Sequence, residues 1–219
     1  FIGGCTLATH YNCATTNKAS YQYSKRRADG TKSIKSGVSL ESVLLDEDWD
    51  IITFQQQSGL SGIYDSWKCH LPLLLSYVKS IVSYPTTFMI HQTWAYDESS
   101  THGDFKRYSH SQETMYRSIV RSVSSISRLT GISRIIPSGT AIQNARTTPL
   151  KDSITRDGYH LSLNVGRYIA ACTWFESLFH KCVVGNPYCP KGMDTKNKFY
   201  AQRAAHAAVS CPVKTIKIR

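Results

Sequence analysis

The sequence has no long hydrophobic run. Its longest apolar stretches, 71–75 and 169–174, are far shorter than the ~20 consecutive apolar residues that a membrane-spanning helix needs. Stretches of this length are typical of buried elements in a folded core. The sequence therefore predicts no membrane span.

Paired cysteine spacing is also missing. Seven cysteines occur, but none forms a CxxC pair and none stands at a spacing typical of a zinc site. Cys172 lies in an apolar helical run, so we expect it in the core. Cys182 and Cys189 flank a Gly-Asn-Pro turn, and a disulfide between them stays open. No metal and no cofactor are predicted.

Acidic residues are few: Asp and Glu total 15 against 26 Lys and Arg, which gives a net charge of +11. The basic residues are scattered, with small clusters at 25–27 and 214–219, and no aromatic residues interleave with them as in a nucleic-acid-binding stripe. A solvated basic surface is the preferred interpretation, and no nucleic-acid partner is predicted. Attraction to an acidic polysaccharide remains an alternative.

The chain has the size and the apolar content of one folded domain. Its 219 residues, 41% of them hydrophobic, suffice for a sizeable core. We expect one domain over 1–219, whose last part, 194–219, is a C-terminal helix and tail. The oligomeric state is not predicted.

Short apolar strands alternate with amphipathic helices along the chain. Strands are predicted at 50–54, 86–90 and 132–136, and helices at 39–46, 67–83, 112–129, 163–179 and 195–209. The remaining predictions are a strand end and glycine turn at 1–9, a long excursion with a hairpin around Asp29 and Gly30, a loop at 138–152 and a short edge strand at 213–218. The alternation predicts an α/β fold in which helices cover both faces of a mostly parallel sheet, a three-layer α/β/α sandwich.

Polar residues follow the predicted strands at the points where these end. Gly3 and Gly4 form a turn that allows the backbone amides to face outward. Three glutamines follow the strand at 50–54, and 91–94 reads His-Gln-Thr-Trp. Functional groups in open α/β sheets gather at the carboxyl ends of the strands. We therefore expect these residues to converge on one rim.

Asp157 and His160 stand three residues apart just before the helix predicted at 163–179. A carboxylate at this spacing can hold one imidazole nitrogen and leave the other free to accept a proton, which is the base half of a nucleophilic triad. The alternative is a surface loop in which Asp157 caps a helix. The convergence expected at the rim favours the catalytic interpretation.

Several of these segments together resemble the SGNH (GDSL-like) hydrolase superfamily, and within it a gut-bacterial esterase-like family. The matching segments, in chain order, are GGCTLATHYN, DEDWDIITFQQQSGLSG, HQTWAY, IIPSGTAIQNAR and TRDGYHLS. The resemblance covers roughly 1–179. It implies the SGNH hydrolase fold, whose sheet is flavodoxin-like.

The resemblance implies a role for each matching residue. His160 is the general base and Asp157 orients it. The backbone N–H of Gly4 and the amide of Gln56 are oxyanion donors, with Gln55 and Gln57 as rivals for the second role. The proposed substrate contacts, listed in chain order, are Gln55, His91, Trp94 and Asn144, and either Trp94 or Tyr96 offers a face on which a sugar could stack.

One departure from the family pattern is important. The nucleophilic serine of the superfamily follows the first strand, and this sequence starts later, at a point equivalent to the glycine turn. The first strand and first helix are therefore expected to be absent, and the serine to lie upstream of Phe1. Cys5, Ser58 and Ser138 are not convincing substitutes.

The predicted function is that of a serine-type ester hydrolase that removes acetyl groups from carbohydrate. This chain alone is expected to be inactive. The resemblance suggests a periplasmic or secreted protein. The alternative is a non-catalytic carbohydrate-binding relative or an inactive fragment of the esterase fold.

Overall fold

Three parallel strands form the centre of the computed structural model, which describes residues 1–83 and 85–219. The sheet order is β3 (Ile51–Phe54), β4 (Thr87–His91) and β5 (Arg134–Ile136). The register pairs Ile51 with Thr87 and Met89 with Arg134. All three predicted strands are confirmed, and they make the protein a mixed α/β fold with a parallel sheet.

The three strands end at the same edge of this sheet, because parallel strands share one direction. β4 pairs with β3 on one side and with β5 on the other. Within the described residues, the second edge of β3 has no strand partner. The carboxyl ends of the three strands therefore lie together, and the lateral edge of β3 beside them is unpaired within the described residues.

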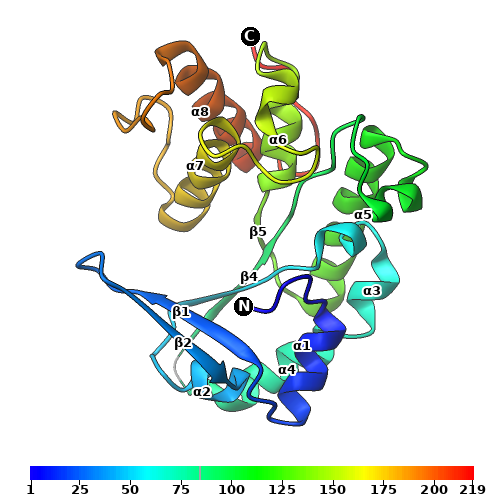
Figure 1. Ribbon diagram of the computed structural model, residues 1–219, viewed down its shortest axis with the longest axis vertical. Helices are drawn as coiled ribbons and strands as arrows, with labels where there is room; N and C mark the ends of the chain where they lie inside the picture. The colour runs from blue at the N-terminus through cyan, green and yellow to red at the C-terminus, as the bar shows by residue number, and fades with distance from the viewer. Residues whose placement is uncertain (84) are drawn as a thin grey trace.

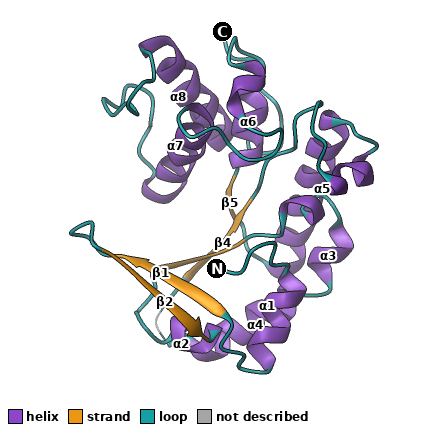
Figure 2. Cartoon of the chain, in the orientation of Figure 1, coloured by secondary structure: helices purple, strands orange, loops and turns teal. Residues whose placement is uncertain are grey.

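Helices form two groups, which bury two separate hydrophobic clusters (Figure 1). The first cluster is packed by α1 (Leu7–Thr15), α2 (Leu40–Leu44), α3 (Tyr64–Lys68), α4 (Leu71–Ile81) and α5 (Gln112–Thr130). The second is packed by α6 (Ser138–Arg146), α7 (Val165–Phe179) and α8 (Thr195–Ser210). Figure 2 shows β4 and β5 running between the two groups. Most of the predicted helices are confirmed to within two residues.

The helix predicted at 67–83 is divided into α3 and α4. The break falls at Cys69 and His70, and Pro72 stands in the first turn of α4. Proline is favoured at the start of a helix, because its missing N–H has no intrahelical partner there. The apolar periodicity continues through the break and conceals it.

The loop predicted at 138–152 is wrong over 138–146. Residues 138–146 form α6, and every residue from Ser138 to Ala145 is buried. A Cβ on Gly139 would lie 2.0 Å from the carbonyl oxygen of Thr93, so glycine allows the start of α6 to pack against the segment after β4. A short helix that is buried on all sides shows no alternation of polar and apolar residues, and the sequence pattern therefore missed it.

Three further segments complete the description. The hairpin around Gly30 is confirmed as β1 (Tyr21–Arg26) paired with β2 (Lys32–Val38). Residues 213–218 form no strand, which corrects that prediction. At 1–9 the glycine turn at Gly3 and Gly4 is present, but no strand precedes it within the described residues, and helix α1 begins at Leu7. All seven cysteines are free thiols, so Cys182 and Cys189 form no disulfide. Among the described residues, no helix has the length and apolarity to cross a bilayer.

Candidate functional site

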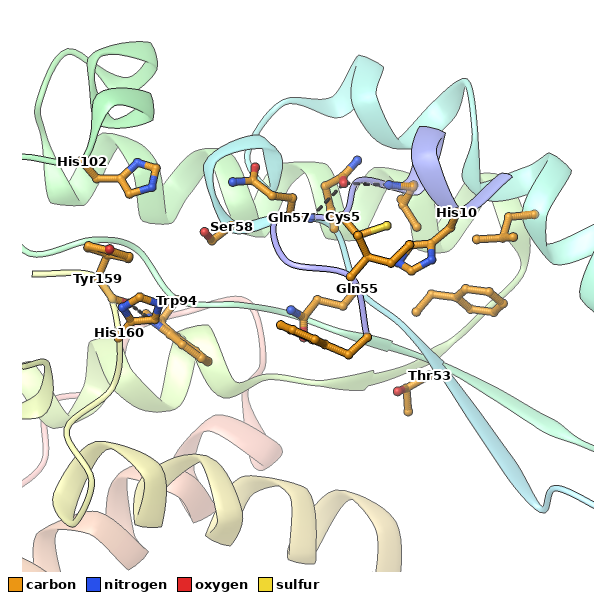
Figure 3. Close-up of a pocket in the computed structure, with 17 residues that line it drawn as sticks. Cys5, His10, Thr53, Gln55, Gln57, Ser58, Trp94, His102, Tyr159 and His160 are labelled. Atoms are coloured by element: carbon orange, nitrogen blue, oxygen red, sulfur yellow. Dashed lines mark hydrogen bonds between the residues drawn. The ribbon is translucent and has the colours of Figure 1, made fainter. Parts of the chain in front are cut away.

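A cavity of about 650 Å³ lies at the carboxyl end of β3 (Figure 3). Gly4, Gln55, Gln56, Trp94 and His160 all line it, so the structure brings together residues that are up to 156 positions apart in the sequence. In Figure 3, His160 and Trp94 lie on one side of the cavity, and Gln55 and Cys5 lie on the other. Asp157 does not line the cavity but contacts the ring of His160.

Asp157 and His160 are joined within one tight loop. The Nδ1 atom of His160 lies 2.6 Å from Oδ2 of Asp157, and the other carboxylate oxygen accepts the backbone N–H of His160 at 2.7 Å. Gly158, with φ of +82°, makes the turn between them. Because Nδ1 faces the carboxylate, the Nε2 atom of His160 is the nitrogen left to exchange a proton.

The Asp157 carboxylate remains ionised in this loop. Partial desolvation opposes ionisation, but hydrogen bonds from the His160 ring and from the backbone of His160 and Tyr159 lower the pKa of Asp157 to about 2. A carboxylate held in this form can orient an imidazole and stabilise the imidazolium that forms when it accepts a proton.

A buried ion pair anchors the loop that carries Asp157 and His160. Asp97 is paired with Arg146 of α6 and also accepts the hydroxyl of Thr155, at the foot of the loop. The backbone N–H of Asp97 donates to the carbonyl of Gly158 at 2.8 Å. The orientation of His160 is thus linked to α6, an element that the sequence pattern did not reveal.

Gln56 is engaged in structural hydrogen bonds. Its side-chain oxygen accepts the N–H of Leu7 at 3.1 Å, and its side-chain nitrogen donates to the carbonyl and the hydroxyl of Ser66 at 3.0 and 3.1 Å. Both amide hydrogens are therefore occupied, and Gln56 is 1% exposed. The predicted oxyanion role of Gln56 does not fit this geometry, because the residue fastens α1 to the end of β3.

Gln55 is arranged differently, and a buried histidine determines its orientation. Trp174 Nε1 lies 3.2 Å from Nε2 of His91. Since an indole nitrogen can only donate, Nε2 of His91 is an acceptor and its proton is on Nδ1. That Nδ1–H donates to Oε1 of Gln55 at 2.5 Å. The Nε2 group of Gln55, with no acceptor among the described residues, is left for the cavity.

His91 was predicted as a substrate contact, but the structure places it behind Gln55. It is 7% exposed, does not line the cavity, and also has the Ser138 hydroxyl 2.9 Å from its Nε2. Burial lowers the pKa of His91 to about 4, so the ring is neutral near pH 7. We therefore assign it a positioning role.

Acidification is expected to destabilise the protein through His91. A histidine in an unfolded chain titrates near ~6.5, whereas His91 in the folded chain has a pKa of about 4. Between these values the unfolded state binds a proton that the folded state does not, so stability falls as the pH drops, by roughly 3 kcal/mol in all. Urea unfolding from pH 7 to pH 4 checks this, with His91→Asn, which keeps a donor for Gln55, expected to show a flatter dependence. Equal slopes for both proteins would contradict it.

The other predicted substrate contacts differ in their positions. Trp94 lines the cavity, and its ring nitrogen donates to the carbonyl of Tyr159 at 2.7 Å. Tyr96 is fully buried and offers no stacking face. Asn144 is also fully buried: its amide bonds the carbonyl of Ala204 and the N–H of Ile216. Asn144 therefore joins α6 to α8 and the tail, which corrects its assignment as a substrate contact.

Sequence reasoning missed several residues that line the cavity. These are His10, His102 and Tyr159, together with Cys5 and Ser58, which the sequence suggests only as weak nucleophile candidates. The ring of Tyr159 contacts that of His160 in a tilted arrangement with centroids 4.1 Å apart, and desolvation lowers the pKa of His10. Tyr159 lies inside the segment TRDGYHLS, between Asp157 and His160, which could have identified it, whereas His102 is brought to the cavity only by the fold.

The arrangement supplies a base and two hydrogen-bond donors at one cavity. Gly4, whose N–H has no acceptor among the described residues, and the amide-bearing Gln55 line the same cavity as His160. Such a set can stabilise negative charge that develops on a carbonyl oxygen while a neighbouring group loses a proton. In the described part of the chain, the one cluster of metal-ligating side chains lies elsewhere.

The chain resembles known proteins of one family. Its residues 1–208 match the family described as Domain of unknown function (DUF4886). The crystal structure of a DUF4886 family protein from Bacteroides uniformis ATCC 8492, at 1.50 Å resolution, is 49% identical in sequence, with a TM-score of 0.97 over 100% of this chain and 84% of that one. No protein with a curated description matches. The chain therefore belongs to the DUF4886 family.

Proposed function

We propose that the cavity is the base and oxyanion half of a serine-type ester hydrolase with an SGNH-type α/β/α fold. The observation that carries this proposal is the His160–Asp157 pair, which faces the same cavity as the free donors of Gly4 and Gln55. The position of this cavity at the carboxyl end of parallel strands supports it, because functional groups gather there in open α/β sheets.

The reaction follows from these positions. A serine hydroxyl attacks the acyl carbon while Nε2 of His160 takes its proton, and the ionised Asp157 stabilises the imidazolium. The carbonyl oxygen becomes negative and accepts hydrogen bonds from Gly4 and Gln55. His160 then protonates the leaving alcohol. Water, activated in turn by His160, hydrolyses the acyl-enzyme and releases the acid.

The proposal places the nucleophilic serine in residues that precede Phe1. The open edge of β3 supports this, because an unpaired strand edge beside a polar cavity is a position that another strand can occupy. The two serines considered above, Ser58 at the cavity and Ser138 beside His91, are both engaged in hydrogen bonds. Ser58 shares a hydrogen bond with Tyr96, and Ser138 is fully buried.

The proposed substrate is an O-acetylated carbohydrate. Trp94 and Tyr159 give the cavity partly exposed aromatic surface beside His160, which suits the apolar face of a sugar ring. A cavity of about 650 Å³ has the size of a small-molecule site. The acyl group is proposed to be acetyl by resemblance to the esterase-like family.

A fluorophosphonate probe tests the reaction class in the full-length protein. We expect stoichiometric labelling of one serine, located by mass spectrometry in a segment before Phe1, and loss of p-nitrophenyl acetate hydrolysis in step with labelling. Heat-denatured protein serves as the control. Absence of labelling, together with retained binding of acetylated sugar, would instead support a non-catalytic carbohydrate-binding protein.

A further inference from the structure

Three side chains of different chemistry converge between α7 and α8, outside the proposed active site. Glu176 belongs to α7, Cys182 to the segment that follows it, and His206 to α8. Their ligand atoms, a carboxylate oxygen, a sulfur and an imidazole nitrogen, all lie within 4.8 Å of one another. It is the one group of this kind in the described residues.

We propose that Glu176, Cys182 and His206 bind a zinc ion. Zn²⁺ accepts sulfur, nitrogen and oxygen ligands together, unlike Mg²⁺ or Ca²⁺, which prefer oxygen alone. Given zinc bond lengths, tetrahedral sulfur and nitrogen ligands are separated by about 3.5 Å. The Sγ of Cys182 and the Nδ1 of His206 are 3.6 Å apart. These two atoms already have the separation expected of two ligands of one zinc ion.

The Glu176 carboxylate is also positioned to bind the same ion. Oε1 of Glu176 lies 2.7 Å from Nδ1 of His206, a hydrogen-bond distance that must open to about 3.3 Å when an ion replaces the proton between them. Oε2 of Glu176 accepts the N–H of Val183 at 2.9 Å. A fixed second oxygen of this kind orients a metal ligand before the ion binds. Only Oε1 is left to bind the metal.

A cysteine-type catalytic triad does not fit the same residues. In such a triad the imidazole faces the thiol with one nitrogen and the carboxylate with the other. Here Nδ1 of His206 faces both Cys182 and Glu176. Three ligand atoms that lie within 4.8 Å of one another, with a single imidazole nitrogen near both others, fit an ion site better than a proton relay.

Three protein ligands leave a fourth position open on the metal. A cavity of about 360 Å³ adjoins the site and is lined by Cys182 and His206, and also by Arg203 and Lys217. A thiolate and a carboxylate neutralise Zn²⁺, and the two cationic side chains then favour water or a small anion as the fourth ligand. Zinc sites with three protein ligands and an open position are typical of catalytic rather than purely structural zinc.

Cobalt substitution tests the site in the reduced protein. Titration with CoCl₂ is expected to give one equivalent of tetrahedral Co²⁺ with a thiolate-to-cobalt charge-transfer band, which ZnCl₂ then removes. Cys182→Ser is expected to abolish the band and to weaken Zn²⁺ binding at least ~10-fold in competition with a chromophoric chelator. Cys182 is exposed, so this variant is expected to fold.

Cys69→Ser is the matched control, because Cys69 is an exposed thiol at the end of α3, outside this cluster. It is expected to keep both the band and the affinity. His206→Gln tests a second ligand and is expected to lose tetrahedral Co²⁺ binding. A wild-type cobalt spectrum with no thiolate band, or equal Zn²⁺ affinities for Cys182→Ser and Cys69→Ser, would overturn the proposal.

Discussion

Replacing His160 with alanine in the full-length protein is expected to lower kcat for p-nitrophenyl acetate by at least ~10⁴-fold. In the proposed mechanism this imidazole takes the serine proton, and among the described residues no other ring in the cavity is held by a carboxylate at 2.6 Å. Its side chain is 51% exposed, so the substitution should leave the thermal unfolding temperature nearly unchanged. The loss would therefore report chemistry rather than folding.

His102→Ala is the matched control for this variant. His102 lines the same cavity, but its Nδ1 accepts the backbone N–H of Asp104 at 3.2 Å and is not held by a carboxylate. We expect its kcat to stay within about tenfold of wild type. Asp157→Asn supplies the second arm: an amide in place of the carboxylate removes the charge that stabilises the imidazolium, and a loss of ~10⁴-fold is expected. Normal acetate release by His160→Ala would rule out the assigned base.

The sheet and the Asp157–His160 pair could be predicted because their signals are local. The strands at 51–54 and 87–91 are short apolar runs, and α5 repeats its buried residues at helical spacing. Asp157 and His160 are three residues apart, so no knowledge of the fold is needed to pair them. The glutamines follow β3, so the rule that functional groups gather at the carboxyl ends of parallel strands predicted their place near the pair.

The errors occurred where the fold overrides local pattern. Helix α6 is buried along most of its length against α8, whose facing residues Ala201, Ala204, Ala205 and Ala208 are fully buried. Contacts between small residues leave no apolar periodicity to detect, so Asn144 was placed in a loop. The choice between Gln55 and Gln56 depends on His91 and Trp174, which lie 83 residues apart. No local sequence feature reports that contact.

Gln55→Ala is expected to reduce kcat by about 10²–10³-fold with little change in KM, the effect of removing one oxyanion donor. The reason is the chain of hydrogen bonds from Trp174 through His91, which holds the carbonyl oxygen of Gln55 and turns its amide nitrogen toward the cavity. In the proposed mechanism this interaction forms only as the substrate carbonyl oxygen becomes negative, so it would lower the barrier without tightening substrate binding. Steady-state kinetics of the full-length protein measure both constants.

Variants at the neighbouring glutamines separate this role from general damage to the segment. Gln57 also lines the cavity, but its side-chain oxygen caps the N–H of Leu60, so Gln57→Ala should keep kcat within about tenfold. Gln56→Ala leaves the backbone N–H of Leu7 and the carbonyl of Ser66 without their side-chain partner. We expect it to lower the free energy of unfolding by about 1–3 kcal/mol. A large kcat loss in Gln57→Ala with none in Gln55→Ala would move the oxyanion donor to Gln57.

His91→Phe removes the N–H donor that orients Gln55. We expect it to reproduce part of the kcat loss of Gln55→Ala, whereas His91→Asn, which keeps a donor, should retain activity.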